Sequence, residues 1–543
     1  MLFFLIIFLA GAAILCVKFY LNNTVPAPAS GGSISLATIG SPRFLNPILS
    51  QLNNSDHDLS LLLFSSLMKY DGQGNLIPDL AEKYEILDDG KTYDVTLRQN
   101  IKWHDGRPLN IDDVIFTLQT IQNSDYKSPL RPLWQGAGFE KIDELTIRFK
   151  LKNPYAPFLH TLTFGILPKH IWENVTPSSF PLNEYNLKPV GSGPYKFVKY
   201  SKDSEGKVKS LEVKASDNYF LGSAHISKIT FYFYDSEEKA ISAYKKGEVN
   251  ALNIVSQKNE QEIKSGGLGL NIYSIELPRY FAIFFNQTQN NLLADKNIRQ
   301  SLALTIDKNK LISEVLGGKG RVSNSPLMLG MTGYTDQVKI YSYDPEAAKN
   351  ILATAGWKDV DDDGVLEKDK DNKKLEIYLA TNDWPELNQT AQIIKEEWEK
   401  IGVKVNLEIK ETAKIQNEII RPRQYQALLF GEVLGLEPDP FSFWHSSQIK
   451  DPGLNLALYA NTEVDKLLVE ARQDLDTARR AQKYQQFSQL ITEDLPAIFL
   501  FSPNYLFAVA KEVKGIELKG LNSLSAHFSQ MDKWYINTKR TWK

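Results

Sequence analysis

Cysteine is almost absent from this sequence, because Cys16 is the only one in 543 residues. A disulfide framework, a cysteine-rich zinc site and a cysteine–cysteine redox pair are therefore excluded within one chain. An excess of one charge sign is also missing: 62 Lys and Arg residues stand against 65 Asp and Glu residues, a net charge of −3. This balance argues against nucleic acid or an anionic membrane surface as the main partner.

The common catalytic motifs are missing as well. The sequence contains no Gly-x-Ser-x-Gly elbow, no His-Glu-x-x-His and no phosphate-binding loop. Its seven histidines include no pair at i, i+4. These absences weigh against an enzyme, but they leave open a secreted hydrolase whose nucleophile and base are distant in sequence.

What is present is typical of a large folded protein. Hydrophobic residues make up 43% and charged residues 23% of the chain, which is wrong for disorder. A chain of 543 residues is long enough for roughly two to four domains. Aromatic residues reach 11%, which suits an aromatic-lined cleft, although a thick core explains most of them.

The one long apolar run lies at the N-terminus. Residues 2–17 contain no charged or strongly polar side chain, and residues 19–21 extend the run past Lys18. This length lies between a signal-peptide core and a short membrane helix. The small residues 26–32 indicate a flexible tether, or a signal-peptidase site after Ala29.

We therefore expect residues 1–30 to be a signal or membrane anchor with its linker. The remainder is expected to be exported, and to be held at the membrane or free in the periplasm or outside the cell. Lipidation of Cys16 stays open, although Leu15 precedes it where a small residue is usual.

Strand and helix patterns alternate along the whole length. Alternating apolar residues predict strands around residues 93–97, 145–151, 229–233 and 403–409, and residues 497–501 predict a buried strand. Asn110 predicts the cap of a helix with Asp113 at its N3 position. Another helix is predicted to start at Asp344-Pro345-Glu346 and to stop at Gly356. Apolar stripes over 464–471 and 478–490 also predict helices. The fold class is therefore α/β or α+β.

Several segments carry a family resemblance. Residues 80–121 read LAEKYEILDDGKTYDVTLRQNIKWHDGRPLNIDDVIFTLQTI. Residues 190–195 then read VGSGPY, residues 297–303 read NIRQSLA, and residues 343–357 begin with YDPE and end with AGW. In this order they resemble the extracellular solute-binding proteins of family 5, which are the oligopeptide, dipeptide and nickel receptors of ABC importers. The resemblance covers roughly residues 33–535.

The resemblance implies an α/β clamp: a type II, cluster C periplasmic-binding-protein fold with two lobes and an additional small α+β domain. On this basis lobe I is expected to comprise 31–70, 188–276 and 497–543, the inserted small domain 71–187, and lobe II 277–496. Closure of the lobes about a hinge would bury the solute.

The function implied is that of an extracytoplasmic receptor that binds short peptides and delivers them to an ABC permease without chemistry. The expected partners are an oligopeptide, the transmembrane permease subunits and, through the N-terminal segment, the membrane. We expect a monomer without a cofactor. The alternatives are the same fold with a nickel chelate, haem, an oligosaccharide or a signalling peptide as ligand, and a secreted hydrolase. A nickel chelate would need a cleft histidine or arginine, and His445 is the histidine next to the candidate loop.

The resemblance also points to a ligand loop, residues 431–444. Peptide-binding relatives place an acid here that pairs with the peptide α-ammonium, but Leu436 occupies that position. Glu432 or Glu437 could replace it through a charge-assisted bond. Asp439, which precedes Pro440, is a further candidate, and its alternative role is to make a turn.

Other candidate ligand contacts are aromatic, lie near the lobe crossing, or belong to residues 41–47, which resemble the family's first strand-to-loop segment at the cleft edge. They are Trp444 with Phe441, Tyr280 and Phe281, and the weaker pair Phe44 and Asn46. Core packing is the alternative for the aromatic residues. Arg279 could meet a carboxylate or lie on the surface.

An acidic loop resembles a calcium-binding loop in part. Asp359, Asp361 and Asp363 stand at positions 1, 3 and 5, with Gly364 at position 6. Position 12 is Lys370 instead of the bidentate glutamate. A solvated acidic turn is the alternative to calcium.

Overall fold

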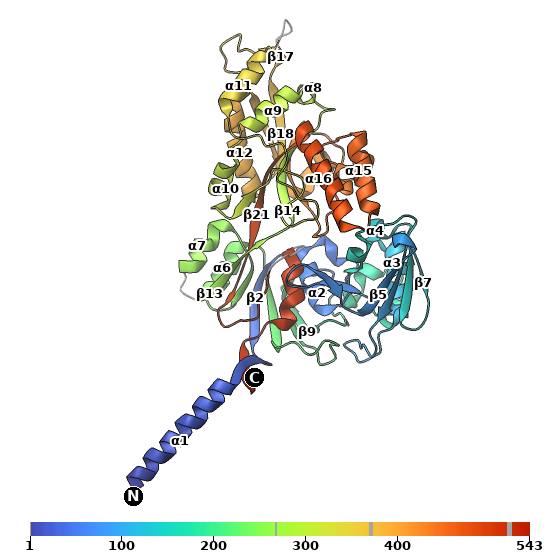
Figure 1. Cartoon of the computed structure of the whole chain (residues 1–543), viewed down its shortest axis with the longest axis vertical. Helices are drawn as coiled ribbons and strands as arrows, with labels where there is room; N and C mark the ends of the chain where they lie inside the picture. Colours follow the sequence, from blue (N-terminus) through green and yellow to red (C-terminus); the bar gives the residue numbers. More distant parts are fainter. Residues whose placement is uncertain (1, 266–268, 369–372, 519–523, 543) are drawn as a thin grey trace.

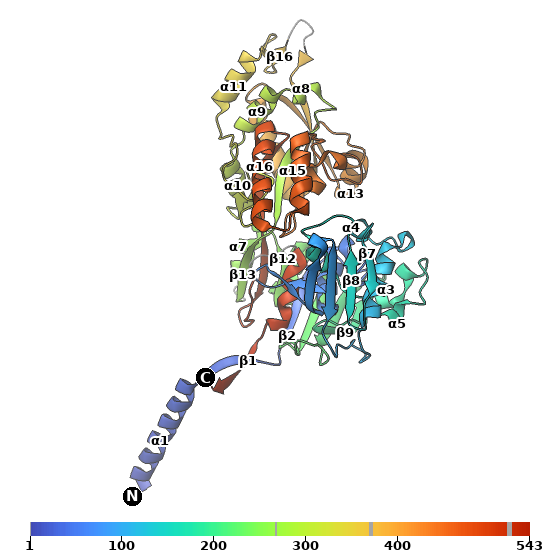
Figure 2. The ribbon, with the colours of Figure 1, turned by 45° about the vertical axis from the view of Figure 1, so that its right-hand side comes forward.

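The computed structural model describes residues 2–265, 269–368, 373–518 and 524–542. Figure 1 shows an upper lobe, a lower lobe, and a third part beside the lower lobe. Helix α1 (Leu2–Asn23) extends away from the lower lobe, and the C-terminus lies where α1 joins the body (Figures 1 and 2).

The lower lobe, lobe I, is built on the strands at one end of a long mixed sheet. Strands β12, β2, β11, β10 and β9 lie side by side in that order, with β2 parallel to both of its neighbours. Alternate residues of β11 such as Ile229 and Phe231 point into a core shared with the C-terminal segment. Its elements are β2 (Ser33–Ile39), α2 (Asn54–Leu63), β9 (Tyr195–Lys202), β10 (Val208–Ala215), β11 (Lys228–Tyr234), α6 (Glu237–Lys245), β12 (Ala251–Val255), α7 (Gln257–Ser265), β13 (Leu270–Glu276) and η9 (Leu524–Lys533).

The upper lobe, lobe II, has helices on both faces of its sheet, in which the strand order is β19-β18-β20-β14-β21. Successive residues of β14 belong to opposite cores, since Phe281 and Ile283 face one and Tyr280 and Ala282 face the other. Its elements are β14 (Arg279–Phe285), α8 (Asn291–Ala294), α9 (Lys296–Leu304), α10 (Lys308–Leu316), β15 (Gly320–Val322), α11 (Pro345–Thr354), β16 (Glu367–Lys368), β17 (Lys373–Lys374), β18 (Glu376–Asn382), α12 (Pro385–Glu399), β19 (Lys404–Lys410), α13 (Thr412–Lys414), a π-helix (Ile415–Ile420), β20 (Ala427–Val433), α14 (Phe441–Trp444), α15 (Thr462–Gln473) and α16 (Thr477–Asp494).

Strand β21 (Ala497–Ala510) belongs to both lobes. Its first half pairs with β14 and its second half pairs with β13, both antiparallel. Leu277 and Pro278, between β13 and β14, make the second crossing. The predicted strand 497–501 is therefore confirmed, but it runs nine residues further than its apolar run indicated, to Ala510. Two adjacent extended segments are the connection about which the lobes can hinge.

The third part is inserted in lobe I and has its own core. A sheet in the order β5-β6-β8-β7 packs on α3, where Asn110 and Asp113 form the predicted capping box. Its connections to the rest of the chain both run through lobe I, so it is joined covalently to that lobe. Its elements are β3 (Met68–Tyr70), β4 (Leu76–Pro78), β5 (Ala81–Leu87), β6 (Thr92–Leu97), α3 (Ile111–Gln122), α4 (Arg131–Trp134), β7 (Gly138–Lys141), β8 (Thr146–Lys150) and α5 (Lys169–Trp172).

The prediction of a flexible tether after α1 is wrong for the first half of that segment. Residues Thr24–Ala29 form β1, which pairs antiparallel with β22 (Asn537–Trp542). Pro26 and Pro28 are tolerated because β1 has a partner on one edge only, so a missing N–H can face solvent. Within the described ranges, no helix combines the length and the hydrophobicity needed to cross a membrane.

Candidate functional site

A cleft of about 390 Å³ lies where the three parts of the molecule meet. The inserted part contributes the turn Gln73–Asn75, the lobe crossing contributes Glu276–Pro278, and lobe II contributes residues 328–331 and Leu436. Asp71 shapes the turn, because its carboxylate accepts hydrogen bonds from the backbone N–H groups of Gln73 and Asn75 (2.9 Å each). Both moving halves and the hinge therefore line one space.

The predicted ligand loop lies at this cleft, but one of its acids is already paired. Glu437 forms an ion pair with Arg480 of α16 (2.9 Å), and it also accepts a hydrogen bond from Thr332 (3.3 Å). Burial raises the pKa of the Glu437 carboxyl, and Arg480 opposes that rise. Leu436, the residue before it, faces the cleft. The carboxylate of Glu437 is thus engaged within lobe II.

Asp439 connects lobe II to the inserted part. Its Oδ2 accepts hydrogen bonds from Arg472 of α15 (2.7 and 3.1 Å) and from the Tyr155 hydroxyl (3.0 Å). The Arg472 guanidinium also lies over the Tyr155 ring, and the Arg472 carbonyl accepts the Ala156 N–H (2.8 Å). We call Tyr155, Asp439 and Arg472 the interdomain contact. A direct role of Asp439 in ligand binding stays a prediction.

Glu432 and Tyr280 form a buried pair on neighbouring strands. Residue Tyr280 of β14 is opposite Glu432 of β20, and the Tyr280 hydroxyl donates to Glu432 Oε2. Burial raises the pKa of Glu432 to about 8, against a smaller opposite effect of the Tyr280 hydrogen bond. Glu432 lines a pocket of about 470 Å³ in lobe II. Val433, next to Glu432, lines the same pocket.

Tyr280 and Phe281 do not meet at one site. They are consecutive residues of a strand, so their side chains point to opposite faces of the sheet. Phe281 lies in the other core of lobe II and borders a separate hollow of about 190 Å³ with Trp384. Arg279 also lines that hollow, and its guanidinium lies over the Phe281 ring (5.3 Å).

Trp444, Phe44 and Asn46 make structural contacts. Trp444 is 1% exposed and packs against Phe284 and Phe499 in the core of lobe II. Phe44 packs on the core of the inserted part, and Asn46 Oδ1 accepts the Ile48 N–H (3.2 Å). None of the three lines the cleft between the lobes. Their roles toward a ligand remain predictions.

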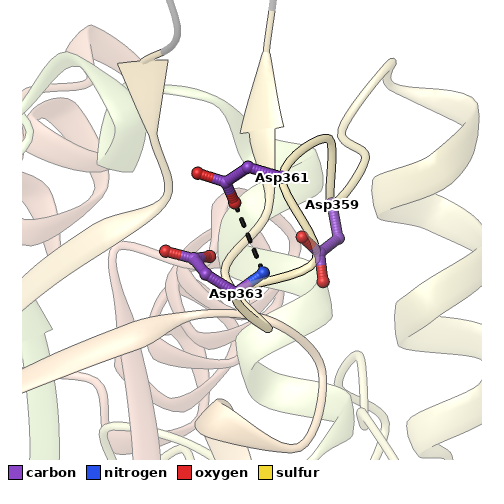
Figure 3. Close-up of side chains that lie close together, drawn as sticks. All are labelled: Asp359, Asp361 and Asp363. Carbon is purple, nitrogen blue, oxygen red and sulfur yellow. Dashed lines mark hydrogen bonds between the residues drawn. The ribbon is translucent and has the colours of Figure 1, made fainter.

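The acidic loop brings its three predicted side chains together. Oxygens of Asp359, Asp361 and Asp363 lie within 4.8 Å of one another, and all three residues are exposed (Figure 3). Lys374 makes ion pairs with Asp361 and Asp363, and the pairing with Asp363 lowers the pKa of that carboxyl. Lys370 lies outside the described residues. A lysine therefore already supplies positive charge here, and calcium stays a prediction.

Comparison with known proteins decides the family. The family model "Bacterial extracellular solute-binding proteins, family 5 Middle" matches residues 75–452. The chain belongs to this family. Family-5 proteins are receptors that bind solutes and do not convert them, and they act in the periplasm or outside the cell. The predicted clamp fold and the absence of enzymatic activity are thereby confirmed.

Similar proteins match this family-5 chain over nearly its whole length. The oligopeptide-binding protein AppA of Bacillus subtilis is 32% identical over 94% of this chain and 92% of its own length. Its solved structure, in complex with a nonapeptide, gives a TM-score of 0.77 and covers 94% of this chain and all of AppA. The dipeptide-binding protein of Escherichia coli is 28% identical over 91% of this chain and 93% of its own. NikZ of Campylobacter jejuni, in complex with Ni(L-His), is 28% identical, with a TM-score of 0.77, and covers 93% of this chain and 99% of NikZ.

Sequence reasoning missed several residues of the cleft and of the interdomain contact. They include Gln73, Asn75, Met328, Tyr155 and Arg472. Tyr155 and Asp439 are 284 residues apart, and no local pattern links them. Asp71 with Asn75 is a turn signal, but a turn signal does not say which cleft the turn will face.

The interdomain contact predicts an effect on lobe closure. The inserted part is covalently joined to lobe I, so the Tyr155–Asp439 hydrogen bond forms across the two moving halves. We expect Tyr155→Phe to shift the receptor toward its open form, because a hydrogen bond to a charged group contributes about 1.5–3 kcal/mol. Small-angle X-ray scattering of the unliganded protein should show a larger radius of gyration.

Tyr126→Phe is the matched control for this prediction. The Tyr126 hydroxyl donates to the Val175 carbonyl, and both residues belong to the inserted part. The control therefore loses a hydroxyl without touching the interdomain contact, and its scattering should match the parent. Equal radii for parent and Tyr155→Phe would show that this contact does not hold the lobes together.

Proposed function

We propose that this family-5 protein is the extracytoplasmic receptor of an ABC importer, and that it captures short peptides between its lobes and passes them on unchanged. The observation that carries the proposal is the match, over 94% of this chain, to a protein whose structure was solved in complex with a nonapeptide. The cleft between the lobes supports it, because the amide residues Gln73 and Asn75 line it together with apolar residues such as Met328. Peptide backbones need such hydrogen-bonding groups, and wet, roomy pockets accept varied side chains.

A nickel chelate is the second candidate. NikZ, whose structure contains Ni(L-His), matches the fold with the same TM-score as the peptide receptor. The position of His445, the histidine considered for nickel binding, argues against a nickel chelate in this protein. His445 stacks on the Phe441 ring, and it does not line the cleft. Peptide binding is therefore preferred.

The placement and assembly of the receptor belong to the same proposal. We propose export through the N-terminal segment and attachment to the membrane by it, or by a lipid on Cys16. Support comes from exposed apolar side chains of α1, such as Phe3 and Ile14, and from the exposed thiol of Cys16. The protein works as a monomer with permease subunits as its partner. We propose the domain limits on the basis of the separate cores. Lobe I comprises 31–70, 188–276 and 497–543, the inserted domain 71–187, and lobe II 277–496.

Thermal unfolding with a peptide library tests the proposal. A peptide at 100 times its Kd should stabilise the native state by about 2.7 kcal/mol, and so raise the melting temperature. Peptides of two to nine residues and Ni(L-His) are compared, and each mixture is analysed afterwards by mass spectrometry. Intact peptides that raise the melting temperature support the proposal. Stabilisation by Ni(L-His) alone would replace the ligand class, and cleaved peptides would contradict a receptor.

A further inference from the structure

Lobe II contains a second pocket, of about 470 Å³. Val433 lines this pocket, and Leu436, three residues later, lines the cleft. The walls are mostly apolar and come from the π-helix, from β20 and from the segment before α15. The apolar wall residues are Ile420, Phe430, Val433, Phe443, Leu454 and Leu456.

A carboxyl group without a counter-ion borders this pocket. Glu432 is 3% exposed, and its side chain lies on the same face of β20 as the wall residue Phe430. Its Oε2 accepts the Tyr280 hydroxyl, whereas its Oε1 is buried and has no hydrogen-bond partner among the described residues. A buried carboxyl is unfavourable in its charged form unless a cation pairs with it.

The neighbouring arginines do not supply that cation. Arg423 donates its N–H groups to the carbonyls of Ile420, Ile449 and Gly453. Arg421 is exposed, and within the described ranges it forms no ion pair. The pKa of Glu432 follows from burial and from Tyr280. Among the described residues, no cation therefore pairs with this carboxyl, and a cation that enters the pocket could do so.

We propose that this pocket receives a basic side chain, lysine or arginine, of the bound peptide, with Glu432 as its counter-ion. The inference rests on the proposed peptide-binding function and adds a preference to it. Apolar walls suit the aliphatic stem of such a side chain, and its ammonium or guanidinium group can reach the carboxyl. Glu437, by contrast, already has Arg480 as its counter-ion.

A peptide α-ammonium is the other source of a cation, and it fits less well. It is attached to the main chain without an aliphatic stem, so the peptide backbone itself would have to enter an apolar-walled pocket. Its hydrogen-bonding groups would then lose water without finding partners on those walls. The basic side chain is therefore the occupant that the wall chemistry favours.

The test compares peptides that differ only in this charge. Affinities are measured by calorimetry for Ala-Lys-Ala and for Ala-norleucine-Ala, and again after N-acetylation of both. We expect lysine to bind at least about tenfold more tightly than norleucine, with or without the acetyl group. In Glu432→Gln the ratio should fall below about twofold, because the neutral amide offers no charge.

Glu397→Gln is the matched control. Glu397 is also a buried glutamate of lobe II, but it already has Lys310 and Lys400 as counter-ions (2.9 and 3.0 Å) and lies in α12, away from the pocket. The lysine preference of this variant should equal that of the parent. A preference lost equally in both variants would indicate general damage to lobe II and would overturn the assignment to Glu432.

Proton release supplies a readout on the unaltered protein. At pH 7 the Glu432 carboxyl is mostly protonated, because burial raises its pKa to about 8. A cation beside it favours the charged form, so binding of the lysine peptide should release up to about one proton. Among the groups that face it, Tyr280 and Tyr425 have a pKa raised by burial and stay neutral. Arg421, Arg423 and the exposed Asp451 are the other ionisable residues that line the pocket.

Calorimetry in two buffers of different ionisation enthalpy measures that release. Release with the lysine peptide and none with the norleucine peptide supports the proposal, and equal values for the two peptides overturn it. Equal affinities with and without the lysine charge would also overturn it, while leaving peptide binding intact. Weaker binding of both peptides on N-acetylation, without a preference for lysine over norleucine, would assign the cation to the peptide terminus and overturn the proposal. Failure of every peptide to bind would instead contradict the proposed function.

Discussion

Gly191→Ala should destabilise the receptor by more than about 4 kcal/mol, because a side chain at this position has no space. A Cβ atom on Gly191 would overlap the Leu63 carbonyl oxygen and lie 2.7 Å from its carbon. Both atoms are backbone at the end of α2, so no side-chain rotation relieves the clash. The helix end and the Gly191–Gly193 turn would have to separate.

Several hydrogen bonds hold this turn in place. The Gly193 N–H donates to the Leu63 carbonyl (2.9 Å), and the Gly191 N–H donates to Nδ1 of His104 (3.1 Å). Burial lowers the pKa of His104 to about 4, which keeps the ring neutral and its Nδ1 able to accept. Displacement of the turn would break these bonds together. This is the physical need for glycine in the Gly-Ser-Gly-Pro-Tyr segment.

Urea unfolding followed by circular dichroism measures the effect, with Gly138→Ala as the control. A Cβ at Gly138 would meet its nearest atoms at 3.6 Å, an ordinary contact, so this variant should unfold near the parent midpoint. Equal midpoints for Gly191→Ala and the parent would contradict the tight contact. Low yield of soluble Gly191→Ala next to normal yield of the control is the same result in a stronger form.

Arg299→Met should destabilise the receptor by about 3–5 kcal/mol, since it leaves several buried carbonyls without a donor. Arg299 of α9 is 5% exposed. Its guanidinium donates to the carbonyls of Leu293 and Ala294 at the end of α8, and to those of Asp494 and Leu495 at the end of α16. Helix C-termini have unpaired carbonyls and negative partial charge, so a cation there stabilises both helices.

Two companion variants make the Arg299 result specific. Arg299→Lys should recover little of the lost stability, because one ammonium cannot replace a planar group that donates in several directions. Arg479→Met is the control, since Arg479 is a mostly exposed residue of α16 that pairs with Asp474 and Asp476. It should change the free energy of unfolding by less than about 1 kcal/mol. Equal denaturation curves for Arg299→Met and Arg479→Met would contradict the proposed role.

Local signals predicted many of the elements because their causes are local. The Asn110 capping box begins α3, Pro345 begins α11 after the cap Asp344, and alternation marks β6 and β8. The Pro-rich strand β1 escaped prediction, since its pairing partner lies at the other end of the chain. The same limit applies to β21, whose second half is a strand because β13 pairs with it.

The candidate site shows the same division. The sequence by itself determined the family and the mixed fold, and it predicted a ligand loop in which Leu436 replaces the usual acid. Only the tertiary structure decided that Asp439 binds Tyr155, that Glu437 has a counter-ion in Arg480, and that Glu432 does not. Capping and alternation depend on neighbours a few residues apart, whereas the state of a carboxyl depends on burial and on charges that distant segments bring to it.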